Sequence, residues 1–212
     1  MTGGRMAAMP DDSWLRNLRP QPRRLSAEEY EALPEEVAKT IEVVDGYVVF
    51  CEAPTRERQR VVRRLATLLE RFTRDAMERG HPCVEVDFDI DLRIHDVPLQ
   101  NRRPDVVVYR CLERGGDVLL RPEGVVLVCE VVSPGSETQD GVDKFGEYAK
   151  AGIPHYWIVR TGGTGVSVIE RYQLDRAAGL YKHVGTFMKE AGGQPQVGEP
   201  FPVTIDWSEL EY

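Results

Sequence analysis

The chain has 212 residues, of which 42% are hydrophobic and 29% charged, and its formal net charge is −8 at pH 7. This length and composition predict a single domain over residues 25–212, preceded by a flexible N-terminus over residues 1–24. Such a chain buries a sizeable core without a disulfide or metal staple. The bulk acidity argues against a protein that coats DNA non-specifically, so any surface that binds a polyanion must be local.

No segment approaches the roughly 20 apolar residues that a membrane-spanning helix needs, and the first residues do not read as a secretory signal. The four cysteines occur singly, without a CxxC pair, which argues against a zinc site; they are Cys51, Cys83, Cys111 and Cys129. Three of the four lie in apolar runs, and we interpret them as small core residues in the reducing cytoplasm. We therefore expect a cytoplasmic protein without a membrane segment.

The first predicted elements are a short helix and a hairpin. Ser26 and Glu29 have the spacing of a capping box, and the helix that they open should end before Pro34. Two β-rich runs then surround Asp45 and Gly46, the dipeptide most typical of a two-residue turn. Residues 40–52 therefore predict an N-terminal β-hairpin.

A long amphipathic helix is predicted over residues 55–79, and Gly80 and Pro82 should end it. Its apolar stripe recurs at three- and four-residue steps and consists of Val61, Leu65, Leu68, Phe72 and Ala76. Residues 54–80 hold eight arginines and four acidic residues. We interpret four of these arginines as candidate contacts to DNA phosphates, with a solvated helix face as the alternative; they are Arg56, Arg60, Arg63 and Arg64.

The middle of the chain is rich in strands. Residues 84–95 alternate strictly between apolar and polar, which predicts one half-buried strand. A loop that contains Pro98 and Asn101 then leads to a strand entered through Pro104. Residues 124–133 are nearly all apolar and predict a strand that is buried on both faces.

A second helix should open at a capping box of Ser136 and Gln139 and stop at Gly152 and Pro154. One more buried strand and two β-rich runs follow, and the two runs predict a C-terminal β-hairpin. The order helix, strand, strand, strand, helix, strand predicts an α/β fold with a mixed β-sheet flanked by helices.

Acidic residues that interrupt apolar strands are the most informative feature. Glu130 lies among valines, a leucine and a cysteine, and burial of an unpaired carboxylate is so costly that it needs a partner, a proton or a metal. Asp105 stands at the start of another apolar strand. Two carboxylates that converge from neighbouring strands offer the hard oxygen ligands that Mg²⁺ prefers, and such an ion can activate a water for attack on a phosphate.

Several ordered segments together resemble a known family: IEVVDG, RRPDVVVY, VCEVVSPGS and DGVDKFGEYAKAGIPHYWIV. They are similar to the Uma-two (DUF820) restriction-endonuclease family of the PD-(D/E)XK nuclease superfamily, and the resemblance covers residues 25–172. It implies a restriction-endonuclease-like fold and Mg²⁺-dependent hydrolysis of DNA phosphodiesters, with Mn²⁺ as a substitute ion. Because many members of the superfamily cut two strands as homodimers, it also implies a homodimer.

The resemblance also implies which residues form the site. The Pro-Asp of the superfamily motif falls on Asp105, its strand glutamate on Glu130, and the family's early glutamate on Glu42. These three would form the metal-binding acidic cluster. The superfamily lysine belongs two residues after the strand acid, where this chain has Val132; in the family a lysine of the following helix takes its place, which is Lys144.

One departure from the family concerns the start of the long helix. Members often carry a histidine there, whereas this chain has Arg58, so no role for that histidine transfers. Tyr148 lies one turn beyond Lys144 on the same helix face, and we interpret it as a packing residue.

Each site residue also has a structural alternative. Asp105 could bond to backbone groups of a turn, and Glu42 could face solvent. Glu130 could form an ion pair with Lys144, and Lys144 could instead pair with Asp140, four residues earlier. The sequence therefore predicts an Mg²⁺-dependent DNA endonuclease. One alternative is a protein that retains the fold without activity and binds DNA or a protein partner; another is an enzyme that hydrolyses RNA or small phosphate esters.

Overall fold

The structure is a computed structural model that describes residues 23–211 except 52, 54, 113–117 and 134–138, and of residues 139–142 only the backbone. Most of the N-terminus that the sequence predicts to be flexible lies outside this part. Arg24, near the end of that predicted segment, contacts the folded part: its guanidinium lies 5.2 Å from the centroid of the Tyr47 ring.

The N-terminal helix and hairpin form as predicted. Helix α2 (Ala27–Glu31) begins at the capping box of Ser26 and Glu29 and is followed by the unpredicted helix α3 (Glu35–Ala38). The hairpin strands pair antiparallel; they are β1 (Ile41–Val44) and β2 (Tyr47–Phe50). The turn residues Asp45 and Gly46 both have positive φ, 50° and 83°, as a two-residue hairpin turn requires.

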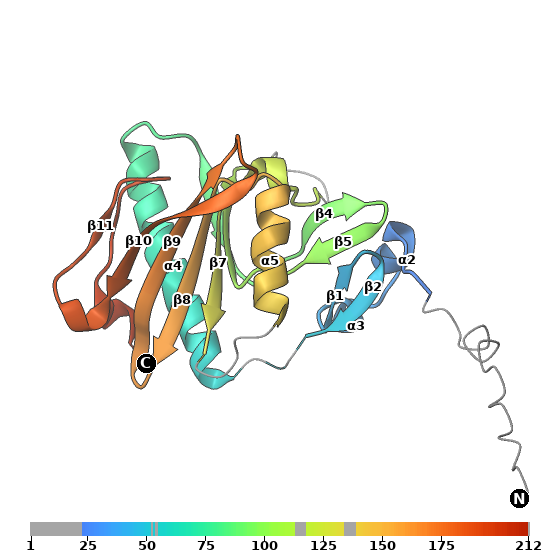
Figure 1. The fold of residues 1–212 in the computed structure, drawn as a ribbon, viewed down its shortest axis with the longest axis horizontal. Helices are drawn as coiled ribbons and strands as arrows, with labels where there is room; N and C mark the ends of the chain where they lie inside the picture. The colour runs from blue at the N-terminus through green and yellow to red at the C-terminus, as the bar shows by residue number, and fades with distance from the viewer. Residues whose placement is uncertain (1–22, 52, 54, 113–117, 134–138, 212) are drawn as a thin grey trace, which may run out of the picture.

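A six-stranded mixed sheet forms the centre of the molecule (Figure 1). In spatial order its strands are β10 (Leu180–Met188), β9 (Gly165–Asp175), β8 (His155–Gly162), β7 (Val125–Val132), β6 (Val106–Arg110) and β3 (Val84–Asp87). The pair β7 and β8 is parallel and is connected by α5 (Gln139–Lys150), whereas the other neighbouring pairs in this sheet are antiparallel. The mixed sheet and the C-terminal hairpin, β9 with β10, are therefore confirmed.

The two long helices cover opposite faces of this sheet. Helix α4 (Arg56–Glu78) buries the predicted stripe, of which Val61, Leu65, Leu68 and Ala76 are fully enclosed. Residues that alternate along the central strands point to α4 on one side, such as Leu127, and to α5 on the other, such as Val128. Figure 1 shows α5 in front of the strands and α4 behind them. The capping box predicted at Ser136 lies outside the described residues.

A second, four-stranded sheet corrects two predictions. Its order is β2-β1-β5-β4, with β5 (Leu99–Arg102) and β4 (Leu92–Asp96). The single strand predicted over residues 84–95 is wrong: it breaks at Asp89, whose φ is +58°, and its halves β3 and β4 belong to different sheets. The predicted loop at Asn101 is strand β5. Strict alternation of apolar and polar residues does not reveal that the chain passes from one sheet to the other. Asp91 helps to fix the second half of the segment by accepting hydrogen bonds from Tyr30 and Arg103.

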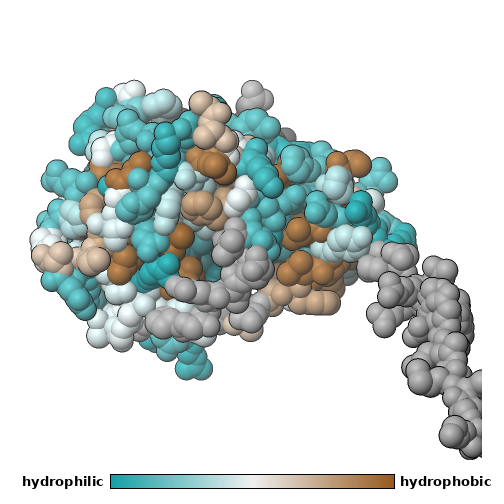
Figure 2. All heavy atoms as spheres, viewed as in Figure 1, coloured by the Kyte–Doolittle hydropathy of each residue, from teal (hydrophilic) through white to brown (hydrophobic). Residues whose placement is uncertain are grey.

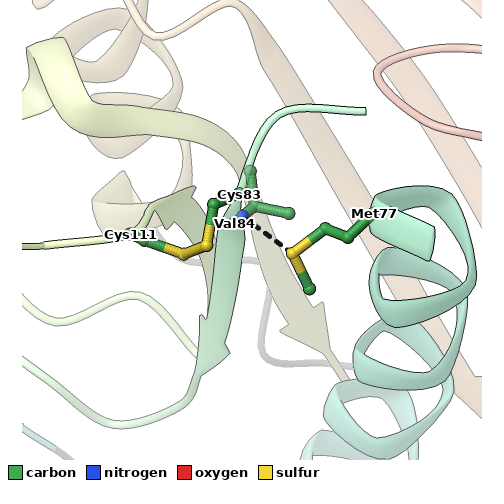
Figure 3. The surroundings of a disulfide bond; sticks show 4 residues. All are labelled: Met77, Cys83, Val84 and Cys111. Carbon is green, nitrogen blue, oxygen red and sulfur yellow. Dashed lines mark hydrogen bonds between the residues drawn. A yellow bond between two sulfur atoms is a disulfide. The ribbon is translucent and has the colours of Figure 1, made fainter. Parts of the chain in front are cut away.

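The interpretation of three of the cysteines as small core residues holds only for Cys129. Cys83 and Cys111 form a disulfide with a Cα–Cα distance of 5.4 Å (Figure 3). They lie beside the paired strands β3 and β6, a relationship that their separation of 28 residues does not reveal. Cys51 is exposed, and only Cys129 is a buried core cysteine. Figure 3 also shows the Val84 N–H donating to Sδ of Met77 on α4, at 3.4 Å.

The surface carries one notable apolar strand. All four residues of β2 are exposed, and Phe50 most of all. Figure 2 shows hydrophobic spheres gathered where Figure 1 places the β1–β2 hairpin, among largely hydrophilic surroundings. Among the described residues, no helix is both long and apolar enough to cross a membrane.

Candidate active site

Glu130 is a buried carboxyl group of the site. It lies on β7 with 6% of its surface exposed. Its Oε1 accepts a hydrogen bond from the Tyr148 hydroxyl at 3.2 Å and lies 3.8 Å from Lys144 Nζ. Burial raises the pKa of Glu130 to about 8; Lys144 and Arg58 oppose this shift, while the negative charges of Asp105 and Glu42 add to it. Removal from water is thus the main cause of the raised pKa, and the neighbouring charges act in both directions.

Glu42 holds Lys144 in place. Both side chains are buried, and Lys144 Nζ lies 2.9 Å from Glu42 Oε1. The same oxygen accepts the backbone N–H of Arg103 at 2.9 Å, and Oε2 accepts from Arg102 Nη1 at 2.8 Å. Burial by itself would raise the pKa of Glu42, but Lys144 and Arg102 outweigh it and lower that pKa. Glu42 is thus an ionised anchor for the lysine, and it does not face solvent.

Asp105 is engaged on both carboxylate oxygens. Arg58 donates to Oδ1 from Nε at 3.2 Å and from Nη2 at 2.9 Å, and to Oδ2 from Nη2 at 2.8 Å. Oδ2 also accepts the Val131 backbone N–H at 2.7 Å, which fixes Asp105 beside the strand that carries Glu130. Arg58 lies in the first turn of α4, whose N-cap Thr55 accepts the Arg58 N–H. The arginine that departs from the family pattern is therefore part of the site.

An arginine and a glutamate that the sequence analysis missed complete the cluster. Arg102 at the end of β5 donates to Glu147 on α5 from Nε at 2.7 Å and from Nη2 at 2.8 Å. This ion pair joins α5 to the second sheet, and the remaining nitrogen of the guanidinium, Arg102 Nη1, donates to Glu42. A signal existed: Lys144, Glu147 and Tyr148 follow each other at helical spacing on one face of α5.

The structure brings together all four predicted residues, from β1, from the start of β6, from β7 and from α5, although these elements are far apart in the chain. The structural alternative for Glu130 was an ion pair with Lys144. Lys144 Nζ does lie 3.8 Å from Glu130 Oε1, within the same cluster. The alternative partner of Lys144, Asp140, falls on a side chain outside the described part. Tyr148 packs in the core as predicted, with no exposed surface, and also contacts Glu130 through its hydroxyl.

The four arginines predicted to contact phosphates differ in their surroundings. Arg56, Arg60 and Arg63 are exposed along α4, the helix that carries Arg58. Arg64 is half-buried, and its Nη1 donates to the backbone oxygen of Glu209 at 3.2 Å. Arg64 therefore ties α4 to the C-terminal segment, and three arginines are left on the exposed face.

Two carboxylates of the site could serve as ligands of a divalent ion. Within the described residues, no three His, Cys, Asp or Glu side chains converge as a ready metal site. Asp105 and Glu130, from the adjacent strands β6 and β7, nevertheless offer the hard oxygen atoms that Mg²⁺ prefers. Burial raises the pKa of Glu130, and a bound cation would stabilise its charged form. The two carboxylates fit a divalent ion once Arg58 no longer donates its hydrogen bonds to Asp105.

Comparisons with known proteins agree with this architecture. A solved structure described as a "putative nuclease belonging to DUF820" from Anabaena variabilis ATCC 29413 is similar, with a TM-score of 0.59. At 12% identity, and covering 83% of this chain and 89% of that one, the likeness concerns the fold. No curated protein matches the chain. The model of the Uma2 family, described as "Putative restriction endonuclease", matches residues 27–207. With most of its length matched, the chain belongs to the Uma2 family.

Proposed function

We propose that the protein is a divalent-metal-dependent endonuclease that hydrolyses DNA phosphodiester bonds at the cluster of Asp105, Glu130 and Lys144. One observation carries the proposal: two carboxylates and an ammonium group, from three separate parts of the chain, meet where burial raises the pKa of Glu130. A buried cluster of this kind is a poor way to stabilise a fold. Strongly perturbed carboxyl groups are concentrated at functional sites, and the family description points to nucleic-acid cleavage.

In this proposal Asp105 and Glu130 hold Mg²⁺, for which Mn²⁺ can substitute. Such an ion would supply Lewis-acid activation of the phosphate and of the attacking water. Asp105 is oriented for this role by the Val131 N–H, and Glu130 by the Tyr148 hydroxyl. Glu42, whose oxygens are held by Lys144, Arg102 and Arg103, positions the lysine instead of binding the ion.

Lys144 stabilises the negative charge that develops on the phosphate in the transition state. Its ammonium is fixed by Glu42, so little reorganisation is needed when the charge appears. The position that the superfamily motif gives to a lysine is Val132, and α5 brings Lys144 within 3.8 Å of Glu130 instead. The helix thus supplies the cation that the strand lacks.

DNA binding is assigned to the exposed arginines of α4. Arg56, Arg60 and Arg63 follow one another along the helix whose first turn reaches Asp105. Contacts of arginine to phosphate fix the register of a duplex and weaken with salt. A homodimer would place two such sites on the two strands of a duplex.

The test is cleavage of supercoiled plasmid in Mg²⁺ or in a chelator. The parent and the surface control Asp75→Asn should nick the plasmid in Mg²⁺ and not in the chelator. Asp105→Asn and Glu130→Gln should not cleave the plasmid in either solution. Cleavage that continues unchanged in both variants would place the activity elsewhere or in a contaminant.

A second candidate is a protein that binds DNA without cutting it. The observation in its favour is the occupation of both Asp105 oxygens by Arg58, which neutralises a proposed metal ligand. Retarded migration of DNA by the parent, with no cleavage in Mg²⁺ or Mn²⁺ and no change in Asp105→Asn, would favour this candidate.

A further inference from the structure

A cavity of about 140 Å³ lies on the C-terminal strands of the main sheet. Its walls include Trp157 of β8, Arg171 of β9 and Val184 of β10, three strands that lie side by side in Figure 1. Trp157 belongs to the core under α4, whereas Tyr148, which contacts Glu130, belongs to the core under α5. The sheet therefore separates Trp157 and the cavity beside it from the acidic cluster, and a ligand in the cavity would not need the nuclease site.

Arg171 is a cation without an anion among the described residues. Its Nε is buried without a hydrogen-bond partner there, and its guanidinium lies 4.4 Å from the centroid of the Phe187 ring. Burial lowers the pKa of Arg171, and no carboxylate compensates for it. Arg58 and Arg160, by contrast, each pair with a carboxylate. A desolvated guanidinium is costly unless it is paired, so Arg171 has unused capacity for an anion.

The neighbouring strand is shaped around this guanidinium. Gly185 lies opposite Arg171 in the β9–β10 register, and a Cβ atom at Gly185 would come within 2.8 Å of Arg171 Nη2. The register shifts between His183 and Gly185, and the intervening residue is Val184, which lines the cavity. The bulge and the missing side chain together leave room for the guanidinium at the wall of the cavity.

We propose that this cavity binds a small apolar or aromatic monocarboxylate, with Arg171 as the counter-ion of its carboxylate group. The planar fork of a guanidinium matches a carboxylate with two parallel hydrogen bonds. Trp157 and Val184 supply apolar walls for the rest of the ligand. A cavity of roughly 150 Å³ accepts benzene, so this cavity suits the ring of a ligand such as benzoate, whose carboxylate would lie at the wall beside Arg171.

Other polar groups of the cavity favour one negative charge over two. Glu199 is part of the wall and accepts a hydrogen bond from Gln173 Nε2 at 3.0 Å, so its carboxylate would repel a dianion. His155 also lines the cavity, and burial lowers its pKa, so that it adds no second cation at neutral pH. A phosphate monoester is therefore the poorer ligand.

The test is calorimetric titration of the full chain with benzoate, and with phosphate at the same ionic strength. Benzoate should bind the parent at millimolar concentrations or below, and phosphate more weakly. Arg171→Met should weaken benzoate binding by about tenfold or more, since it removes a charge-assisted bidentate pair. Arg176→Met, at an exposed arginine of the β9–β10 turn, is the matched control and should bind like the parent.

Arg171→Met removes an unpaired desolvated cation, so its melting temperature should equal or exceed that of the parent. Gly185→Ala gives a second variant: its Cβ displaces the guanidinium and should weaken benzoate binding while the arginine is retained. Equal benzoate affinity in the parent and Arg171→Met, tighter binding of phosphate than of benzoate, or no binding of benzoate by the parent would each overturn the proposal.

Discussion

The guanidinium of Arg58 donates three hydrogen bonds to the carboxylate of Asp105, at 3.2, 2.9 and 2.8 Å. The same carboxylate is a proposed ligand of the catalytic ion. Arg58 and the ion therefore compete for the same oxygen atoms, and the bound state requires the arginine to move away. Arg58 is about one third exposed, so it has a path to solvent or to a DNA phosphate.

Arg58→Met should raise the affinity for Mn²⁺ about tenfold, the equivalent of roughly 1.4 kcal/mol, because the competing cation is removed and the aliphatic stem is kept. Without metal the variant should melt at a lower temperature than the parent, since Asp105 loses its counter-charge, and Mn²⁺ should stabilise it more. Calorimetric titration and thermal melting measure the two effects. Arg60→Met, at an exposed arginine two residues away, is the control; equal Mn²⁺ affinity in Arg58→Met and Arg60→Met would show that Arg58 does not compete.

Lys144→Met should lose both stability and turnover. Breaking the buried pair with Glu42 leaves a carboxylate without its lysine, which costs about 3 kcal/mol. Loss of the positive charge at the phosphate should lower the rate by roughly 10²-fold. The double variant Lys144→Met, Glu42→Gln separates the two effects: it should recover part of the melting temperature, since Arg102 loses its charged partner at the same time, and none of the plasmid cleavage. Recovery of cleavage in the double variant would reduce Lys144 to a structural ion.

Glu130→Gln should remove a pH dependence of stability in metal-free buffer. The pKa of Glu130 is raised from 4.5 to about 8 in the folded protein, so the folded state retains a proton that the unfolded state releases within that range. This contribution to stability is complete at acidic pH and is lost as the pH rises through the folded value. Melting temperatures of the variant and parent should therefore be close at about pH 5 and diverge towards about pH 8, with the variant the more stable. A constant difference across this range would show that Glu130 titrates normally.

The disulfide should stabilise the segment that carries Arg102, Arg103 and Asp105. Cys83 and Cys111 close a loop with a sequence separation of 28, for which loop entropy predicts a contribution of about 3 kcal/mol. The double variant Cys83→Ser, Cys111→Ser should therefore unfold at a lower urea concentration than the oxidised parent and match the reduced parent. A parent whose urea midpoint does not respond to reductant would contradict this contribution.

The sequence predicts well those features that depend on local spacing. The capping box at Ser26, the turn at Asp45 and Gly46, and the stripe of α4 all need only residues a few positions apart. The break at Asp89 was missed because both halves keep the same alternation while they join different sheets. Resemblance to the family placed Glu42, which the residues alone left as a solvent-facing acid.

Long-range partners were the features that the sequence could not supply. Arg58 and Asp105 are 47 residues apart, and Arg102 and Glu147 are 45 apart. The bond from Arg58 depends on how α4 packs across one face of the sheet, which no periodicity encodes. For the same reason the disulfide between Cys83 and Cys111 was hidden, although the pairing of β3 with β6 makes it simple to explain.

The most direct measurement for the nuclease site is anomalous diffraction from crystals of the protein soaked in Mn²⁺. One strong peak is expected between the carboxylates of Asp105 and Glu130, with the Arg58 guanidinium turned away from Asp105 and Lys144 still paired with Glu42. A soak that leaves all three Arg58 hydrogen bonds on Asp105 and places Mn²⁺ elsewhere, or nowhere, would contradict it.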